Sequence, residues 1–207
     1  MPNPSPGPMA AKNRMRAGLL ATRRSMPAGV RAVADASITA ALVEAVRSRS
    51  ARVVTAYVPI AGEPGGSGLH RALAEALGPG GRLLLPVLCA DADLDWAGYD
   101  GPDSLRAGRR GLREPAGRRL GRAAVADADL VIVPAVAVDL AGLRLGRGGG
   151  SYDRALARTA TARLVVAPLY AGELVAAVPA EPHDRPVGAA VVAAPDGLTA
   201  GWRTLPV

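Results

Sequence analysis

The feature that most restricts the fold of this chain is a change of hydrophobic period near residue 52. Residues 52–58 form a run rich in β-branched side chains, closed by Pro59 and a glycine loop, as is typical of a buried strand. Residues 68–77 then repeat apolar side chains at helical spacing, and residues 82–88 form a second apolar strand. The order strand, helix, strand predicts a βαβ unit with two parallel strands.

The segments around this unit carry similar signals. We expect helices over residues 10–24, 28–49, 68–77 and 151–160, a further helix that ends near residue 128, and strands over residues 52–58, 82–88, 94–97, 130–133, 164–168 and 189–193. The polar stretch 91–119, broken by glycine and proline, predicts a hairpin or an excursion. The expected fold class is therefore α/β, a three-layer, mostly parallel open sheet with helices on both faces.

The length of the chain fits one hydrophobic core. It has 207 residues, which lies within the usual range of a single domain. Residues 1–8 alternate proline with small polar residues, which predicts a flexible N-terminal tail over residues 1–9. Residues 10–207 are expected to form a single α/β domain.

The formal net charge of +7 raises nucleic acid or an anionic membrane as a partner. However, Lys12 is the one lysine, arginine supplies the remaining basic side chains, and phenylalanine is absent. This composition is typical of a GC-rich genome, and an aromatic content of 3% is low for base-stacking surfaces. We expect small-molecule partners and no nucleic acid, and keep a basic nucleic-acid-binding protein as an alternative.

The cysteine content and the apolar runs indicate where the protein works. The one cysteine, Cys89, has no partner for a disulfide within the chain, which favours a reducing compartment. No stretch approaches the roughly 18 apolar residues of a membrane span, and the start of the chain lacks the pattern of a secretory signal. We expect a cytoplasmic monomer that does not bind membranes.

The stretch from Gly142 to Asp153 is a glycine-rich turn that leads into a predicted helix. Glycines let backbone N–H groups converge on an anion, and a helix N-terminus attracts negative charge. Arg144 and Arg147 add guanidinium groups that suit phosphate oxygens. The turn has no Walker A lysine, and Ser151 replaces the third glycine of a dinucleotide fingerprint. It predicts a phosphate site of another kind, and a flexible linker is the alternative.

Several polar residues near this turn have two interpretations each. Asp153 either compensates the helix dipole or holds magnesium. His183 and Asp184 lie in a proline-framed loop and are either metal ligands or bases, or part of a solvated turn. Glu63, just after a strand, is a loop carboxylate or a partner for a substrate N–H group. Lys12 is either a phosphate ligand that arginine cannot replace or a chance survivor of the composition.

In chain order, these segments resemble the 5-formyltetrahydrofolate cyclo-ligase family over about residues 12–193. The most specific part is DLAGLRLGRGGGSYDR at residues 139–154, which is similar to the family signature of Arg-Leu-Gly, spaced glycines and Tyr-Asp-Arg. Further similarities are KNRMR at 12–16, the Gly-Glu pair at 62–63, GLREP at 111–115 and residues 179–184. Several similarities in the same order are more specific than one glycine loop.

This resemblance implies a reaction. Members of the family cyclise 5-formyltetrahydrofolate to 5,10-methenyltetrahydrofolate, require ATP and Mg²⁺, and release ADP and phosphate through a phosphorylated formyl group, an iminium phosphate. The protein would then mainly position two substrates and neutralise charge on the transferring phosphoryl group.

The resemblance also implies roles for individual residues. The catalytic residues would be Arg147 and Tyr152, and the metal ligands Asp153 and Asp184. The ATP-binding set would comprise Lys12, Arg16, Arg144, Leu145, Gly146, Arg147, Gly148, Gly149, Gly150, Ser151 and Tyr152. The substrate-binding set would comprise Ile60, Glu63, Arg147, Gly148, Gly149, Gly150 and Ser151.

The chain departs from the family pattern at three places. Ser151 stands where many members have a second aromatic residue in the signature. Gly65 and Gly66 stand where a further carboxylate and a threonine often follow the glutamate, so the pterin contact of that carboxylate has no counterpart. Glu173 stands where glutamine is common.

A different α/β enzyme, acting on a sugar phosphate or an acyl-coenzyme A, would also need an anion-binding glycine turn. It predicts no coupling of ATP hydrolysis to folate, and this difference separates it from the cyclo-ligase.

Overall fold

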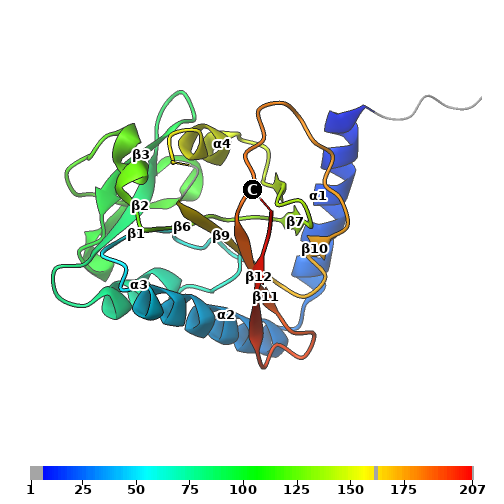
Figure 1. The fold of residues 1–207 in the computed structure, drawn as a ribbon, viewed down its shortest axis with the longest axis horizontal. Helices are drawn as coiled ribbons and strands as arrows, with labels where there is room; N and C mark the ends of the chain where they lie inside the picture. The colour runs from blue at the N-terminus through cyan, green and yellow to red at the C-terminus, as the bar shows by residue number, and fades with distance from the viewer. Residues whose placement is uncertain (1–6, 161–162, 207) are drawn as a thin grey trace, which may run out of the picture.

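The computed structural model describes residues 7–160 and 163–206. Its centre is a seven-stranded sheet in the order β12-β11-β9-β6-β1-β2-β3 (Figure 1). The strands are β1 (Val53–Thr55), β2 (Arg82–Leu88), β3 (Leu94–Gly98), β6 (Leu130–Ile132), β9 (Leu164–Leu169), β11 (Ala189–Ala193) and β12 (Ala200–Thr204). The five inner strands are parallel, and the two edge strands β3 and β12 pair antiparallel to their neighbours.

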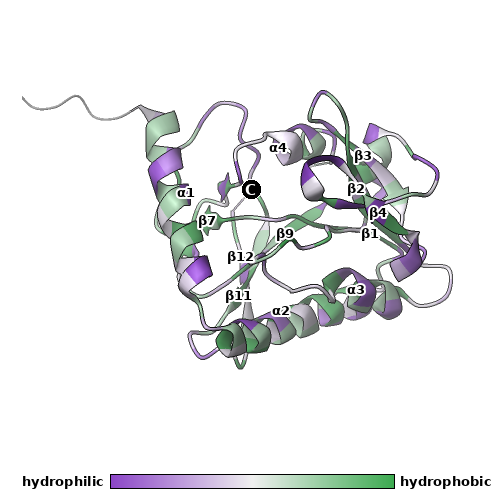
Figure 2. Ribbon diagram, turned by 180° about the vertical axis from the view of Figure 1, so that it is seen from behind, coloured by the Kyte–Doolittle hydropathy of each residue, from purple (hydrophilic) through white to green (hydrophobic). Residues whose placement is uncertain are grey.

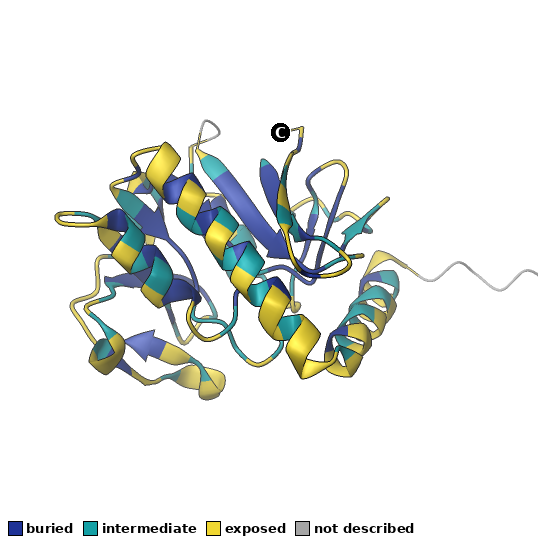
Figure 3. Ribbon diagram, turned by 90° about the horizontal axis from the view of Figure 1, so that it is seen from below, coloured by how far each residue is buried: buried dark blue, intermediate teal, exposed yellow. Residues whose placement is uncertain are grey.

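Helices cover both faces of this sheet. On one face, α2 (Ala28–Ser48) and α3 (Leu69–Leu77) pack on alternate strand residues such as Val54, Leu85 and Ile132. Figure 3 shows the two helices with exposed residues outward and the buried strands behind them. On the other face, α4 (Ser151–Leu156) and the 3₁₀ helix η3 (Arg122–Asp127) pack on the intervening residues, among them Val131 and Val165. The predicted three-layer α/β fold is confirmed.

A smaller layer adjoins the main sheet. Strands β7 (Ala137–Asp139), β8 (Arg144–Leu145) and β10 (Leu174–Val175) form a three-stranded sheet in the order β10-β7-β8. Helix α1 (Pro8–Ser25) lies beside it (Figure 2) and packs Met15, Leu19 and Leu20 on a small apolar cluster of that sheet. This contact brings the N-terminal helix next to the glycine-rich turn.

A buried ion pair fixes α1 in this position. The Arg23 side chain is 3% exposed, and its Nε donates to Glu173 Oε1 at 2.6 Å. Its Nη2 donates to Glu173 Oε2 at 2.8 Å and to the Ala135 carbonyl at 2.7 Å. Glu173 Oε2 also accepts from the Tyr170 N–H. Glu173, the departure from the family pattern, is therefore the counter-ion of a buried arginine.

The polar stretch between residues 91 and 119 contains β3 and then a separate hairpin. Strands β4 (Leu105–Ala107) and β5 (Arg113–Pro115) form it, and 3₁₀ turns η1 (Pro102–Ser104) and η2 (Arg109–Gly111) flank or join them. The predicted hairpin and the 94–97 strand are confirmed.

Several element boundaries differ from the prediction. Helix α1 begins at Pro8, because proline suits the first turn of a helix; residues 1–6 of the predicted tail lie outside the described residues. The segment before residue 128 is the 3₁₀ helix η3, and α4 ends at Leu156 rather than at residue 160. Strands β7, β8, β10 and β12 were not predicted, because two or three residues carry no period and β12 contains an internal glycine.

No helix among the described residues is long and apolar enough to cross a membrane.

Candidate active site

A cavity of about 490 Å³ opens where the parallel strands β1, β2 and β6 end. Its walls come from α1, the loop after β1, the β4–β5 hairpin, the glycine-rich turn and the 179–184 loop. Ligand sites of open α/β sheets lie at the carboxyl ends of strands. Every residue that the sequence predicted for ATP, substrate, metal or catalysis lines this one cavity. The fold thus brings them together; their individual roles remain predictions.

The glycine-rich turn follows β8 and runs directly into α4. Gly148 and Gly150 have φ angles of +96° and +65°, a region that side chains with a Cβ rarely adopt. A Cβ at Gly146 would lie 2.6 Å from an Arg144 nitrogen. The first backbone bond of α4 runs from Arg154 N–H to the Gly150 carbonyl, so the N–H groups before it point out of the helix start, as an anion site requires.

Arg144 and Asp153 form an ion pair under this turn. The Arg144 side chain is buried, and its Nη2 donates to Asp153 Oδ1 at 2.8 Å. The guanidinium also lies 5.8 Å from the centre of the Tyr152 ring, within cation–π range. Both partners were predicted as ligands, Arg144 of ATP and Asp153 of a metal, and here each neutralises the other.

Arg147 and Glu63 join the turn to the loop after β1. Arg147 Nε donates to Glu63 Oε1 at 3.0 Å, and the Ile60 N–H donates to Glu63 Oε2 at 3.1 Å. The Arg147 side chain is 43% exposed whereas that of Glu63 is 8% exposed. The arginine can therefore turn toward a ligand at small cost, while the carboxylate is held in place.

The loop that carries Glu63 is fixed from beneath. The Tyr170 hydroxyl donates to Asp35 Oδ1 at 2.7 Å and lies 3.2 Å from the Glu63 carbonyl. Asp35 Oδ1 also accepts from the Gly65 N–H, and the Tyr57 hydroxyl donates to the Pro64 carbonyl. The two glycines that depart from the family pattern lie in this tight turn, with positive φ at Gly65 and Gly66.

Helix α1 contributes two basic residues. Lys12 Nζ donates to Glu181 at 2.7 Å and to Asp184 at 2.7 and 3.0 Å, and Arg16 Nε donates to the Gly146 carbonyl at 2.8 Å. Burial raises the pKa of the Asp184 carboxyl, but the hydrogen bond and charge of Lys12 lower it more, so that pKa is below its ordinary value. Asp184 is therefore an anion at neutral pH.

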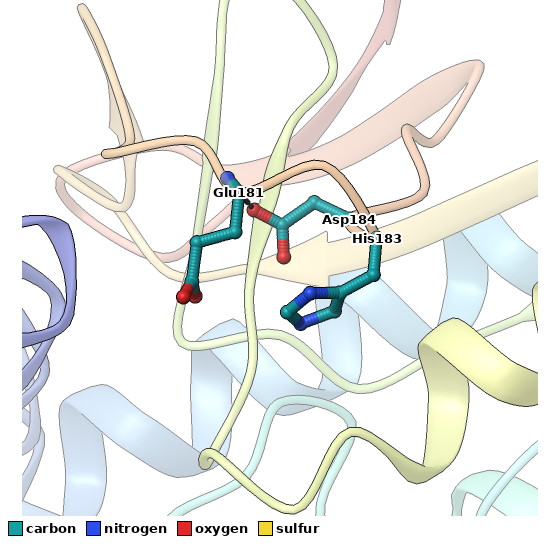
Figure 4. Close-up of side chains that lie close together, drawn as sticks. All are labelled: Glu181, His183 and Asp184. Atoms are coloured by element: carbon teal, nitrogen blue, oxygen red, sulfur yellow. Dashed lines mark hydrogen bonds between the residues drawn. The ribbon is translucent and has the colours of Figure 1, made fainter.

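One group of potential metal ligands lies in the cavity wall. Glu181, His183 and Asp184 each offer a ligand atom within 4.8 Å of the others, and Figure 4 shows them converging from one loop, with the Glu181 N–H bonded to Asp184. The predicted partner Asp153 lines the same cavity but does not belong to this group. Carboxylate oxygens suit Mg²⁺, whereas imidazole does not, so the donors that fit this ion are the carboxylates.

Tyr152 has the properties of a hydrogen-bond donor. Burial raises the pKa of its hydroxyl well above the ordinary value, and the nearby Glu63 charge raises it further, with Arg144 acting in the opposite direction. The hydroxyl therefore stays protonated at physiological pH. It can donate to a developing negative charge but cannot serve as a general base.

Other residues of the cavity wall were not predicted. They include Glu114 of the hairpin, Arg110 of the η2 turn, Glu181 and Tyr57. Glu114 lies within the GLREP segment that resembles the family, and Glu181 lies in the same proline-framed loop as Asp184. The sequence analysis singled out both segments but predicted no role for these two glutamates. Nothing in the local sequence signals that Arg110 lies near Gly149, because β4 and β5 place it there.

The fold and the cavity define a class: an α/β protein with a cavity at the carboxyl ends of its parallel strands, lined by a glycine turn with arginines and by buried carboxylates. The chain belongs to the 5-formyltetrahydrofolate cyclo-ligase family, whose model matches residues 8–193. The predicted family is thus confirmed.

Individual relatives agree with this assignment. The chain is 41% identical to a 5-formyltetrahydrofolate cyclo-ligase of Mycolicibacterium smegmatis over 179 residues, which cover 84% of this chain and 89% of the relative. The solution structure of Aquifex aeolicus 5,10-methenyltetrahydrofolate synthetase matches with a TM-score of 0.76 at 27% identity, covering 94% and 92% of the two chains. The synthetase of Mycoplasma pneumoniae, at 18% identity and a TM-score of 0.66 with 85% and 94% covered, shares the fold.

Proposed function

We propose that this protein catalyses the ATP- and Mg²⁺-dependent cyclisation of 5-formyltetrahydrofolate to 5,10-methenyltetrahydrofolate. Family membership supports the reaction class. The observation that carries the proposal further is the Arg147–Glu63 contact, because it joins a cationic phosphate-type turn to a buried carboxylate within one cavity. A phosphoryl donor and an N–H-bearing ring can thus meet at one point.

The proposed chemistry has two steps. The formyl oxygen attacks the γ-phosphorus of ATP, and the bond between this phosphorus and the β,γ-bridging oxygen breaks to release ADP. The product of this step is an iminium phosphate. N10 then attacks the formyl carbon, the new C–N bond closes the ring, phosphate leaves with the former formyl oxygen, and N10 loses its proton to solvent. Phosphorylation is needed because an unactivated formamide oxygen is a poor leaving group.

The side chains divide these tasks. Arg147 leaves Glu63 and stabilises the charge on the transferring phosphoryl group. Lys12, Arg16 and Arg144 hold the ATP phosphates together with the backbone of the turn from Leu145 to Ser151, and Tyr152 donates a hydrogen bond. Ile60 and Glu63 line the folate side, where the glycines at 148–150 also approach the formyl end.

Asp153 and Asp184 are the proposed magnesium ligands. Each is a cavity-lining carboxylate that pairs with a basic side chain, Arg144 and Lys12 respectively. Such pairs keep carboxylates charged and oriented until a stronger cation competes for them. Bound Mg²⁺ would neutralise charge on the nucleotide phosphates.

The single deciding experiment mixes purified protein, 5-formyltetrahydrofolate, Mg²⁺ and ATP and follows the near-ultraviolet absorbance of the methenyl product. We expect product in equal amounts to the ADP released, and none without ATP or with excess chelator. A folded protein that forms no product would refute the proposal. Turnover of a sugar phosphate or an acyl-coenzyme A, or salt-sensitive binding of nucleic acid, would favour the alternatives instead.

Asp153→Asn should lower the metal-dependent rate by about 10²-fold, since a neutral amide is a weak Mg²⁺ ligand. The amide oxygen can still accept from Arg144, so α4 should remain folded. Initial rates over a Mg²⁺ titration check this, with circular dichroism as the folding control. The exposed Asp103→Asn in η1 is the matched control and should behave as wild type. An unchanged rate for Asp153→Asn would remove this residue from the metal site.

We also propose a cytoplasmic monomer whose partners are small molecules rather than nucleic acid. The support is compositional: one cysteine, arginine-rich positive charge and few aromatic residues. Light scattering of the purified protein tests the oligomeric state.

A further inference from the structure

Glu114 is a buried carboxylate that faces the cavity without a basic partner. It lies in β5, is 8% exposed and lines the cavity. Its Oε1 accepts from the Leu88 N–H at 2.9 Å. Among the described residues it takes part in no ion pair, unlike Glu63, which Arg147 neutralises. Burial of an unpaired carboxylate is costly, and a ligand that donates hydrogen bonds to Glu114 in the cavity would offset this cost.

Apolar residues line the cavity on one side of Glu114. Leu88 and Leu94 belong to a buried cluster against which Leu112 packs, and all three line the cavity beside the carboxylate. Lys12 and Arg16 of the cavity belong to α1, and Arg144 and Arg147 to the glycine-rich turn. Arg110 and Arg113 of the hairpin also line the cavity, but among the described residues neither forms an ion pair with Glu114. A phosphate would lie against the unneutralised charge of Glu114, so this part of the cavity suits a flat, apolar ring with donor atoms at its edge.

The hairpin is built to hold this carboxylate. A Cβ at Gly108 would lie 2.4 Å from Glu114 Oε2, so a larger residue there would have to displace the carboxylate. The Gly108 N–H donates to the Leu112 carbonyl at 2.7 Å, which closes the hairpin around the site.

We propose that Glu114 binds the donor edge of the folate ring, accepting hydrogen bonds from its N3–H and 2-amino groups. This inference rests on the proposed function. The two adjacent donors of a 2-amino-4-oxopyrimidine match the two oxygens of a carboxylate. The adenine edge instead places the N1 acceptor beside the 6-amino donor, and this acceptor would repel a carboxylate. This pairing places the folate ring on the side of the cavity formed by Leu88 and Glu114. It also supplies a carboxylate for the ring, which Gly65 and Gly66 cannot do because they have no side chain.

The test is Glu114→Gln, because the amide oxygen can still accept from the Leu88 N–H while the amide nitrogen faces the ring donors. We expect the KM and the calorimetric Kd for 5-formyltetrahydrofolate to rise about 10- to 100-fold. The KM for ATP and the unfolding midpoint should stay at wild-type values. Glu75→Gln, an exposed glutamate of α3, is the matched control and should change none of these quantities.

Comparing two ligands on the same protein tests the contact independently of any change in folding caused by the substitution. Wild-type protein should bind a 5-formyltetrahydrofolate analogue with hydrogen in place of the 2-amino group about 10-fold more weakly than the parent, whereas Glu114→Gln should discriminate less than about 3-fold. Equal discrimination by both proteins, or a rise in the KM for ATP instead of folate, would overturn the proposal.

The outcome for Glu114 can be separated from the outcome for the reaction. If the wild type binds the folate but forms no methenyl product, the proposed function fails and the two Kd ratios still decide about Glu114. If the wild type forms product while Glu114→Gln binds folate equally well, only the assignment of Glu114 fails.

Discussion

Arg147→Ala is expected to lower kcat for methenyl formation by about 10³-fold, with a much smaller change in the KM for ATP. A guanidinium that stabilises a transferring phosphoryl group acts mainly in the transition state, and loss of such a donor typically has effects of this size. The Arg147 side chain is 43% exposed, so its removal leaves no void in the core and the fold should tolerate it. Single-turnover absorbance at saturating substrates measures the effect.

Two controls separate catalysis from a structural cause. Arg71→Ala removes an exposed arginine of α3 that pairs with Glu75 and should leave kcat unchanged. Arg147→Ala also leaves Glu63 without a partner, so the double variant Arg147→Ala/Glu63→Gln tests whether the stranded carboxylate is the cause. Recovery of kcat in the double variant would contradict a direct role for Arg147.

Glu173→Ala should destabilise the protein by about 3–5 kcal/mol, because it leaves the Arg23 guanidinium buried without its counter-ion. Within the described part of the chain, Arg23 Nη1 already has no hydrogen-bond partner, so few other groups could replace Glu173. Urea unfolding followed by circular dichroism measures the free energy of unfolding.

Two matched substitutions test whether the buried charge of Arg23 causes the loss of stability. Glu173→Gln keeps an acceptor for Arg23 and for the Tyr170 N–H, so it should cost less than Glu173→Ala. The double variant Arg23→Met/Glu173→Leu removes both charges and should recover most of the loss. If Glu173→Ala unfolds as the wild type does, the pair does not anchor α1. Because α1 carries Lys12 and Arg16, a loosened helix should also raise the KM for ATP.

Much of the fold followed from local patterns. The βαβ unit, the long helices and most strands of the main sheet have a period that a few neighbouring residues reveal, and the structure confirms them. The short strands β8 and β10 were missed because they exist only through pairing with β7. Edge strand β12 was missed for a related reason: its glycine and exposed residues pair with β11 without an apolar run of their own.

The site followed from the sequence in part. The segment from Gly142 to Asp153 identified the family, and its residues from Arg144 to Asp153 line the cavity as a group. That the turn binds an anion stays a prediction. Glu114 was not recognised, because its local segment reads as an ordinary hairpin. Only the tertiary structure shows that Glu114 lines the same cavity as Glu63 and that, among the described residues, no basic side chain pairs with it.

The sequence by itself determined the α/β class, the family and the position of the glycine-rich turn, because these depend on the order and spacing of nearby residues. Only the tertiary structure decided which charges meet. Lys12 bonds to Asp184 across 172 positions of sequence, and Arg23 to Glu173 across 150. Pairing over such separations is set by how α1 packs on the small sheet, and no local pattern encodes it.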